Sequence, residues 1–166
     1  MNIDVSVEAG AWPPQDVLAQ TVRSAVQAAA ATARMAGGAA LPATGSEGEI
    51  SVVFTDDAAI RALNGRWRSQ DSATNVLSFA QGGPGREAGM LGDIVLAQET
   101  VAREAVLAGK QLDHHIAHMV IHGFLHLLGY DHQNDTDAQT MEDLERNALK
   151  AIGIAGPYDR SGTKDD

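Results

Sequence analysis

Three histidines, His122, His126 and His132, are spaced in a way that suits metal binding. On a helix, residues four apart lie on the same face with Cβ atoms about 5–6 Å from each other, so the first two imidazoles can bind one ion. The third ligand must come from a returning segment, and Gly129 is placed to end the helix in the left-handed conformation that favours glycine. We therefore predict one zinc ion bound by three imidazoles, with a fourth position open for water.

The alternative interpretation is that these are ordinary histidines of a buried helix, which would be preferred for any one of them alone. Three together at H-x-x-x-H-x-x-G-x-x-H spacing favour a metal site. The chain contains no Cys, so the set is not a fragment of a Cys/His structural zinc knot. The pattern indicates a metal that takes part in chemistry.

Two residues near the histidines are candidates for supporting roles. His118 lies one helical turn before His122, too far along the helix to share the same ion as His126, and is expected to make a substrate contact or to support a ligand. Asp131 precedes His132 and is expected either to orient a ligand imidazole or to cap the turn.

Length and composition indicate one cytoplasmic domain. The 166 residues suffice for one domain with its own core, predicted over residues 1–156, and the polar segment 157–166 is expected to be a flexible tail. The absence of Cys, of a basic and apolar leader at the N-terminus and of a membrane-spanning apolar run favours a reducing compartment without membrane contact. A net charge of -10 argues against non-specific binding to nucleic acid. Residues 61–110, with six basic and five acidic side chains, still permit a local phosphate site.

The hydrophobic pattern predicts an α+β domain, with one small mixed sheet of about four strands and helices packed on it. Strands are expected over 2–8, 49–55, 74–80 and 91–97. Helices are expected over 16–35, 99–108 and 111–128. A short helix is expected to follow capping side chains at 55–57 and to end at Gly65, and a last one to run from a cap at Thr136 or Asp137 to residue 152. The glycine-rich segment 81–89 is expected to be a flexible loop.

The histidine spacing resembles the extended signature of metzincin metallopeptidases, H-E-x-x-H-x-x-G-x-x-H. In that signature the residue after the first histidine is a glutamate that acts as general base. Here this position is Gly123, which cannot accept a proton. The metal-binding histidines of a peptidase are therefore matched, but its general base is missing.

A closer resemblance is to the YbeY family of bacterial endoribonucleases, which are rRNA maturation factors. It runs from about Ile50 to Ile154, and its most specific part is the string His-Gly-x-Leu-His-Leu-x-Gly-Tyr-Asp-His. The other matching segments are 64–68, 74–79, 91–95, 118–121 and Met141 with Glu145. The chain differs at Ala80, where a proline is common, and in its glycine-rich loop.

The resemblance implies a zincin-like fold, with His122, His126 and His132 as zinc ligands and Arg68 as a functional arginine. The implied activity is cleavage of single-stranded RNA in rRNA maturation and ribosome quality control, with the ribosome or ribosomal proteins as partners. His122 and Arg68 would then be catalytic.

Two mechanisms suit such a site: attack by metal-bound water, or activation of the RNA's own 2′-hydroxyl. In both, Arg68 would stabilise charge on the phosphate and contact the substrate together with Asn75 and His118. Trp67 is a candidate for stacking on a base, although a lone tryptophan is more often buried packing. Two other functional classes remain alternatives: a zinc peptidase or amide hydrolase, and a ribosome-associated protein whose metal is mainly structural.

Overall fold

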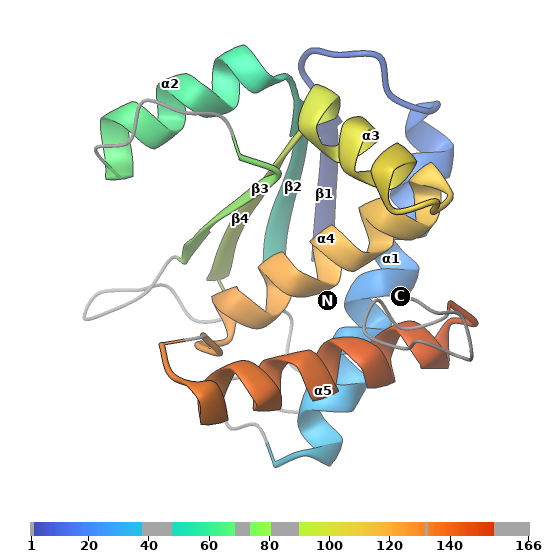
Figure 1. The fold of residues 1–166 in the computed structure, drawn as a ribbon, viewed down its shortest axis with the longest axis vertical. Coiled ribbons are helices and arrows are strands. Elements are labelled where there is room, and N and C mark those ends of the chain that lie inside the picture. The colour runs from blue at the N-terminus through green and yellow to red at the C-terminus, as the bar shows by residue number, and fades with distance from the viewer. Residues whose placement is uncertain (1, 38–47, 69–73, 81–89, 132, 155–166) are drawn as a thin grey trace.

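Four strands form one mixed sheet with helices on both of its faces (Figure 1). The computed structural model describes residues 2–37, 48–68, 74–80, 90–131 and 133–154. Its strands are β1 (Asn2–Val7), β2 (Glu49–Thr55), β3 (Val76–Ala80) and β4 (Met90–Ala97). Its helices are α1 (Gln15–Met35), α2 (Asp57–Arg68), α3 (Gln98–Leu107), α4 (Leu112–Leu127) and α5 (Asp135–Ala151).

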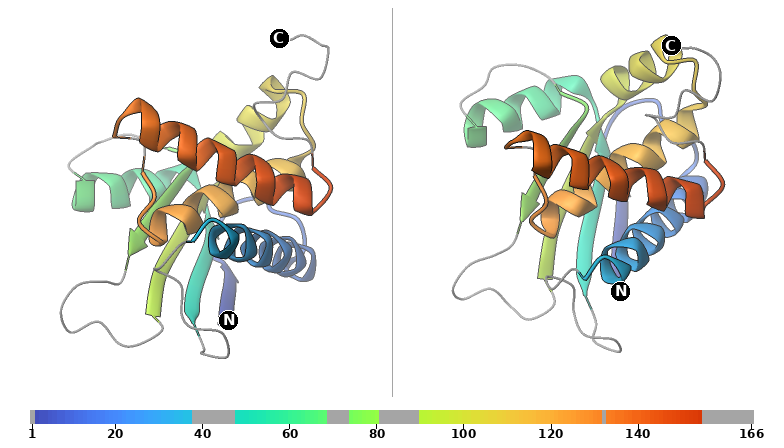
Figure 2. Two further views of the ribbon diagram at one scale, coloured as in Figure 1. Left: turned by 90° about the horizontal axis from the view of Figure 1, so that it is seen from below. Right: turned by 60° about the horizontal axis from the view of Figure 1, so that its bottom comes forward.

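The strand order is β1-β2-β4-β3, and β3 is the antiparallel strand at one edge. The pairs β1 with β2 and β2 with β4 are parallel, as expected for strands joined through helices. Side chains alternate between the two faces, so Ile94 and Leu96 of β4 join the larger core while Val95 faces the other side. The larger core also takes in residues of α1, α4 and α5. Figure 2 shows these three helices on one side of the sheet and α2 on the other.

A bulge interrupts the pairing of β2 with β4. Glu49 pairs with Met90 and Ile50 with Gly92, so Leu91 is the extra residue. Gly92 has φ +143°, and a Cβ there would overlap the carbonyl oxygen of Phe79 on β3. Only glycine fits this close approach of two backbones.

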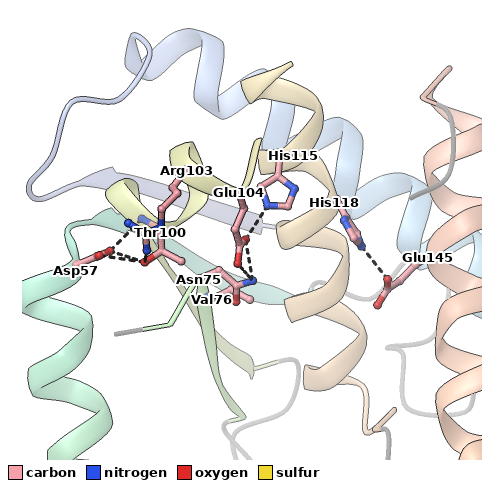
Figure 3. Close-up of polar contacts among 9 residues, drawn as sticks. All are labelled: Asp57, Asn75, Val76, Thr100, Arg103, Glu104, His115, His118 and Glu145. Atoms are coloured by element: carbon pink, nitrogen blue, oxygen red, sulfur yellow. Dashed lines mark hydrogen bonds and ion pairs between the residues drawn. The ribbon is translucent and has the colours of Figure 1, made fainter. Parts of the chain in front are cut away.

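The helix α2 is anchored at its start to the start of α3. The carboxylate of Asp57 accepts hydrogen bonds from the backbone N–H of Thr100 at 3.2 Å and from its hydroxyl at 2.9 Å. In return, Glu99 accepts a hydrogen bond from the backbone N–H of Asp57 at 2.8 Å. Each helix thus supplies a side chain that satisfies an N-terminal donor of the other, and Figure 3 shows the Asp57–Thr100 pair. On the same face of the sheet, Ile60 and Leu63 of α2 pack against Val95.

The predicted α+β class and the mixed four-stranded sheet are confirmed, and two helix boundaries were wrong. Gly65 does not end α2, which continues to Arg68 because its apolar side packs on the sheet and outweighs the roughly 1 kcal/mol cost of an interior glycine. The cap of α5 is Asn134, whose side chain accepts a hydrogen bond from the N–H of Asp137 at 2.8 Å. The predicted loop 81–89 and tail 157–166 lie outside the described residues. Within the described residues, every helix is too short or too polar to cross a bilayer.

Candidate metal site

The helix α4 ends in a backbone turn that requires a left-handed residue. Gly129 has φ +102°, and its N–H donates to the carbonyl of His126 at 3.0 Å. The N–H of Tyr130 donates to the carbonyl of Leu125 at 3.1 Å. This pair of hydrogen bonds is the Schellman arrangement, which satisfies the last carbonyls of the helix. The predicted turn at Gly129 is therefore present.

His122 and His126 converge through the same ring nitrogen. Their Nε2 atoms lie 3.1 Å apart, and their ring centroids are 4.6 Å apart with the ring planes at 82°. Two imidazoles bound to one zinc ion at about 2.05 Å in tetrahedral geometry would have nitrogens roughly 3.3 Å apart. The spacing of the two nitrogens therefore suits a shared ion.

A buried carboxylate on α5 lies behind this pair. Glu145 Oε2 is 2.6 Å from Nδ1 of His122, and Glu145 Oε1 is 2.8 Å from Nε2 of His118. The side chain of Glu145 is only 1% exposed. Figure 3 shows the contact between His118 and Glu145, which joins α4 to α5. A carboxylate buried this deeply needs such partners to offset its lost hydration.

The charge of Glu145 fixes which nitrogen of His122 carries the proton. Burial alone would raise the pKa of Glu145, but the hydrogen bonds from His118 and His122 outweigh it and lower the pKa from 4.5 to about 2. An ionised carboxylate only accepts hydrogen bonds, so Nδ1 of His122 is the donor. The lone pair of a neutral His122 is then on Nε2, the atom that faces His126. This arrangement of carboxylate, histidine and metal position is typical of zinc sites.

The third predicted ligand, His132, lies outside the described residues. Among the residues that are described, no group of three or more histidine or acidic side chains is arranged to bind a metal ion. Asp131, predicted to support a ligand, is exposed and its Oδ2 accepts a hydrogen bond from Gln133 at 3.1 Å. Its role toward His132 stays a prediction.

The residues predicted to contact substrate lie in different surroundings. Arg68 is the last residue of α2, and its side chain lies outside the described part of the structure. His118 is buried and bonded to Glu145. Asn75, just before β3, donates its amide to Glu104 at 3.1 Å while its Oδ1 accepts from the N–H of Val76 at 2.7 Å. The substrate roles of these three residues stay predictions.

A second polar cluster, shown in Figure 3, joins α3, α4 and the start of β3. Nε2 of the buried His115 lies 2.9 Å from Oε1 of Glu104, which also holds Asn75. Burial lowers the pKa of His115, and the hydrogen bond to Glu104 opposes that shift. This cluster connects the segment before β3 to α4, the helix that carries His122 and His126.

Sequence reasoning assigned no role to Glu145 or Glu104. The signal for Glu145 was an acidic residue on the apolar side of α5, four positions after Met141 and next to Leu144, both of which are buried. An acid on a core-facing stripe must be paired, so its position alone indicated a partner. The identity of the partner depended on how α5 crosses α4.

Gly123, the residue after the first histidine, packs against the sheet. A Cβ at this position would lie 2.8 Å from Cγ2 of Ile94 and 3.0 Å from Oγ of Ser78. The hydroxyl of Ser78 donates to the carbonyl of Gly123 at 3.0 Å. The position that holds the general base in the metzincin signature is therefore a contact between helix and sheet here, which disfavours the peptidase alternative.

Comparison with known proteins identifies the family. The family model described as "Endoribonuclease YbeY" matches residues 9–153 of the chain. The chain belongs to the YbeY family. A relative from Rhizobium meliloti named "Endoribonuclease YbeY" is 49% identical over 161 residues, covering 95% of each chain. Another YbeY, from Methylocella silvestris, is 50% identical over 159 residues, which are 94% of this chain and 85% of the relative.

The fold of this chain is also found in a solved structure. The solution structure of TM1509 from Thermotoga maritima matches with a TM-score of 0.55 over 98% of this chain and 99% of that one. At 20% sequence identity, this likeness shows the fold alone. The family membership that the motifs predicted is confirmed by the matched relatives.

Proposed function

We propose that this YbeY family member is a zinc-dependent endoribonuclease that cleaves single-stranded RNA. The observation that carries the proposal is the 3.1 Å approach of Nε2 of His122 to Nε2 of His126, with Glu145 bonded behind His122. Two neutral imidazoles that converge in this way form most of a three-histidine site. The relatives named endoribonuclease make RNA the substrate of choice.

The residues of the chain have separate tasks in this proposal. His122 and His126 would hold the ion together with His132. When bound, zinc supplies positive charge that polarises the phosphate and favours deprotonation of water. Glu145 keeps the Nδ1 proton of His122 in place, and Arg68 would donate to the phosphate oxygens on which negative charge grows during cleavage.

We further propose that ribosomal RNA is a substrate and that the ribosome or its proteins are partners. A chain with net charge -10 repels a polyanion, so non-specific attraction cannot bring it to RNA. A partner that carries basic surface would compensate for this repulsion. We propose the cytoplasm as the location for such a role, which would include ribosome quality control.

The test is cleavage of an unstructured RNA by purified protein loaded with zinc, with casein as the competing substrate. We expect RNA cleavage that is lost with His126→Ala and with added chelator, and strongly reduced with Arg68→Ala. His114→Ala, on the same helix but outside the convergent pair, is the matched control and should retain activity. Cleavage of casein alone would favour the peptidase alternative, and RNA cleavage that survives His126→Ala would indicate a contaminating nuclease.

The same assay separates the two mechanisms. An RNA with a single 2′-deoxy nucleotide at the cleavage position lacks the internal nucleophile at that bond. If water attacks, this substrate is still cut there. If the 2′-hydroxyl attacks, cleavage at that bond is lost and the unmodified RNA yields a 2′,3′-cyclic phosphate.

A further inference from the structure

The second half of α2 forms one wall of a groove on the face of the sheet opposite α4. The groove has a volume of about 650 Å³, within the range of ligand pockets. From α2 it is lined by Leu63, Arg66 and Trp67, and from the sheet by Val53, Phe79 and Val95. Its walls are therefore mainly apolar and include two aromatic rings.

Trp67 is exposed although it is the largest side chain of this groove. Its exposed fraction is 66%, so packing against the residues that the structure describes leaves most of the side chain uncovered. The other tryptophan, Trp12, is different: its ring packs on Phe54 at 4.8 Å, and its N–H donates to the carbonyls of Ala9 and Thr55. This exposure does not fit buried packing and favours the binding role for Trp67.

The charges around the groove indicate what would bind there. Arg66 lines the groove beside Trp67, and Arg68 follows in the sequence. An aromatic ring beside a guanidinium group can stack on a base while the cation contacts the phosphate. Two other lining residues, Glu8 and Asp93, are acidic and would repel a phosphate in their part of the groove. The apolar part therefore suits a base, and the phosphate belongs on the side of Arg66.

The groove and α4 lie on opposite faces of β3, the strand at the edge of the sheet. Phe79 of β3 lines the groove, while the neighbouring Ser78 points to the other face and bonds the carbonyl of Gly123, the residue after His122. Because β3 is at the edge of the sheet, a flexible strand that passes around this edge would reach both faces. A single-stranded RNA can follow such a path, whereas a stiff duplex cannot.

We propose that this groove is a base-binding subsite for single-stranded RNA, in which an unpaired nucleobase stacks on Trp67 and Arg66 contacts the adjoining phosphate. The inference rests on the proposed RNA substrate and adds a second contact region, separate from the metal ligands. It assigns α2 a role in substrate binding through Trp67.

The experiment measures binding without cleavage, with metal-free protein in chelator and a short 2′-O-methyl oligonucleotide. Trp12→Phe leaves Trp67 as the single tryptophan, and Trp67→Phe leaves Trp12. We expect the oligonucleotide to quench the fluorescence of the Trp12→Phe protein and not that of the Trp67→Phe protein. A duplex of the same sequence should give no quenching.

Affinity, measured by fluorescence anisotropy at fixed ionic strength, supplies the second readout. We expect Trp67→Ala to weaken binding about 5- to 150-fold, since a stacked base contributes roughly 1–3 kcal/mol. Trp67→Phe should recover part of this loss because phenylalanine still offers a ring. The side chain is exposed, so thermal unfolding of both variants should match that of the parent.

The outcomes separate this subsite from the catalytic proposal. His126→Ala should abolish cleavage while keeping the quenching of Trp67. If the protein binds RNA through Trp67 but does not cleave it, the endoribonuclease proposal is overturned and the subsite proposal stands. Unchanged affinity in Trp67→Ala, or equal quenching in both single-tryptophan proteins, would overturn the subsite and leave the groove to an apolar segment of a protein partner.

Discussion

The imidazole of His122 is held from both sides: Nδ1 lies 2.6 Å from Oε2 of Glu145, while Nε2 lies 3.1 Å from Nε2 of His126. Glu145 is 23 positions further along the chain, so the packing of α5 on α4 determines the orientation and the tautomer of a predicted ligand. A ligand fixed before the ion arrives loses little freedom on binding it.

Glu145→Gln should weaken zinc binding about 10- to 100-fold, the usual effect of removing a carboxylate that supports a ligating histidine. Glutamine keeps the shape of the side chain but removes the charge that holds the Nδ1 proton. Competition against a chromophoric chelator measures the affinity. Glu142→Gln, on the same helix, is the control, and equal affinities for the two variants would show that Glu145 does not support the site.

The burial of His115 should make the metal-free protein less stable as the pH falls below about 6.5, the usual pKa of histidine. Because burial lowers the pKa of His115 in the folded state, the unfolded chain takes up the proton first. The contribution of neutral His115 to folding stability is therefore complete above the pKa of this residue in the unfolded chain. It declines as the pH falls, down to the lower pKa of His115 in the folded state. The hydrogen bond to Glu104 limits this decline.

Urea unfolding between pH 5 and pH 7 tests this effect in the parent and in His115→Gln. The variant should lose less stability on acidification because it has no proton to take up at this position. Leu112→Ala, which alters packing at the start of the same helix but no titrating group, should keep the slope of the parent. An unchanged slope in His115→Gln would contradict the prediction.

Gly92→Ala should destabilise the fold by roughly 3–5 kcal/mol, since it combines backbone strain with overlap against the carbonyl of Phe79. Gly109→Ala is the matched comparison. Gly109 also has a positive φ, +66°, but no atom lies within 4 Å of its Cβ position, so the cost should be only about 1 kcal/mol. Equal losses in urea unfolding would mean that the bulge can relax.

Gly123→Ala should destabilise by about 1 kcal/mol, because overlap with Ile94 exceeds the gain in helix propensity. Ile94→Ala removes the overlapping atoms at a cost of about 2–5 kcal/mol. In that background, Gly123→Ala should be neutral or stabilising. A double-mutant cycle by chemical unfolding measures this coupling, and simple additivity of the two changes would show that Ile94 is not the obstacle.

Local patterns predicted most of the fold, and they were wrong where packing between elements decides. Alternation in residues 2–8 and short apolar, β-rich runs elsewhere predict the four strands, and the turn at Gly129 follows from the conformational freedom of glycine. The poor helix propensity of Gly65 predicts a helix stop, but contacts of α2 with the sheet outweigh one weak position. The antiparallel placement of β3 at the edge depends on contacts far apart in sequence, which periodicity does not contain.

The candidate site was predictable to the same degree. The pairing of His122 with His126 follows from four-residue spacing on one helix. The role of Glu145 does not, because it depends on the angle at which α5 crosses α4. For Trp67, the sequence favoured buried packing, and the exposed side chain could be recognised only once α2 was placed on the sheet. His132 and the side chain of Arg68 stay predictions from motif spacing.

The alanine-rich side of α1 limits how this helix can repack next to α4. After Val26, every buried residue of α1 is an alanine: Ala28, Ala29, Ala30 and Ala33. Alanine has no rotamers with which to adapt, so these positions of α1 cannot repack within the core that α1 shares with α4. An added methyl group on this side would press into that shared core, and α4 carries His122 and His126.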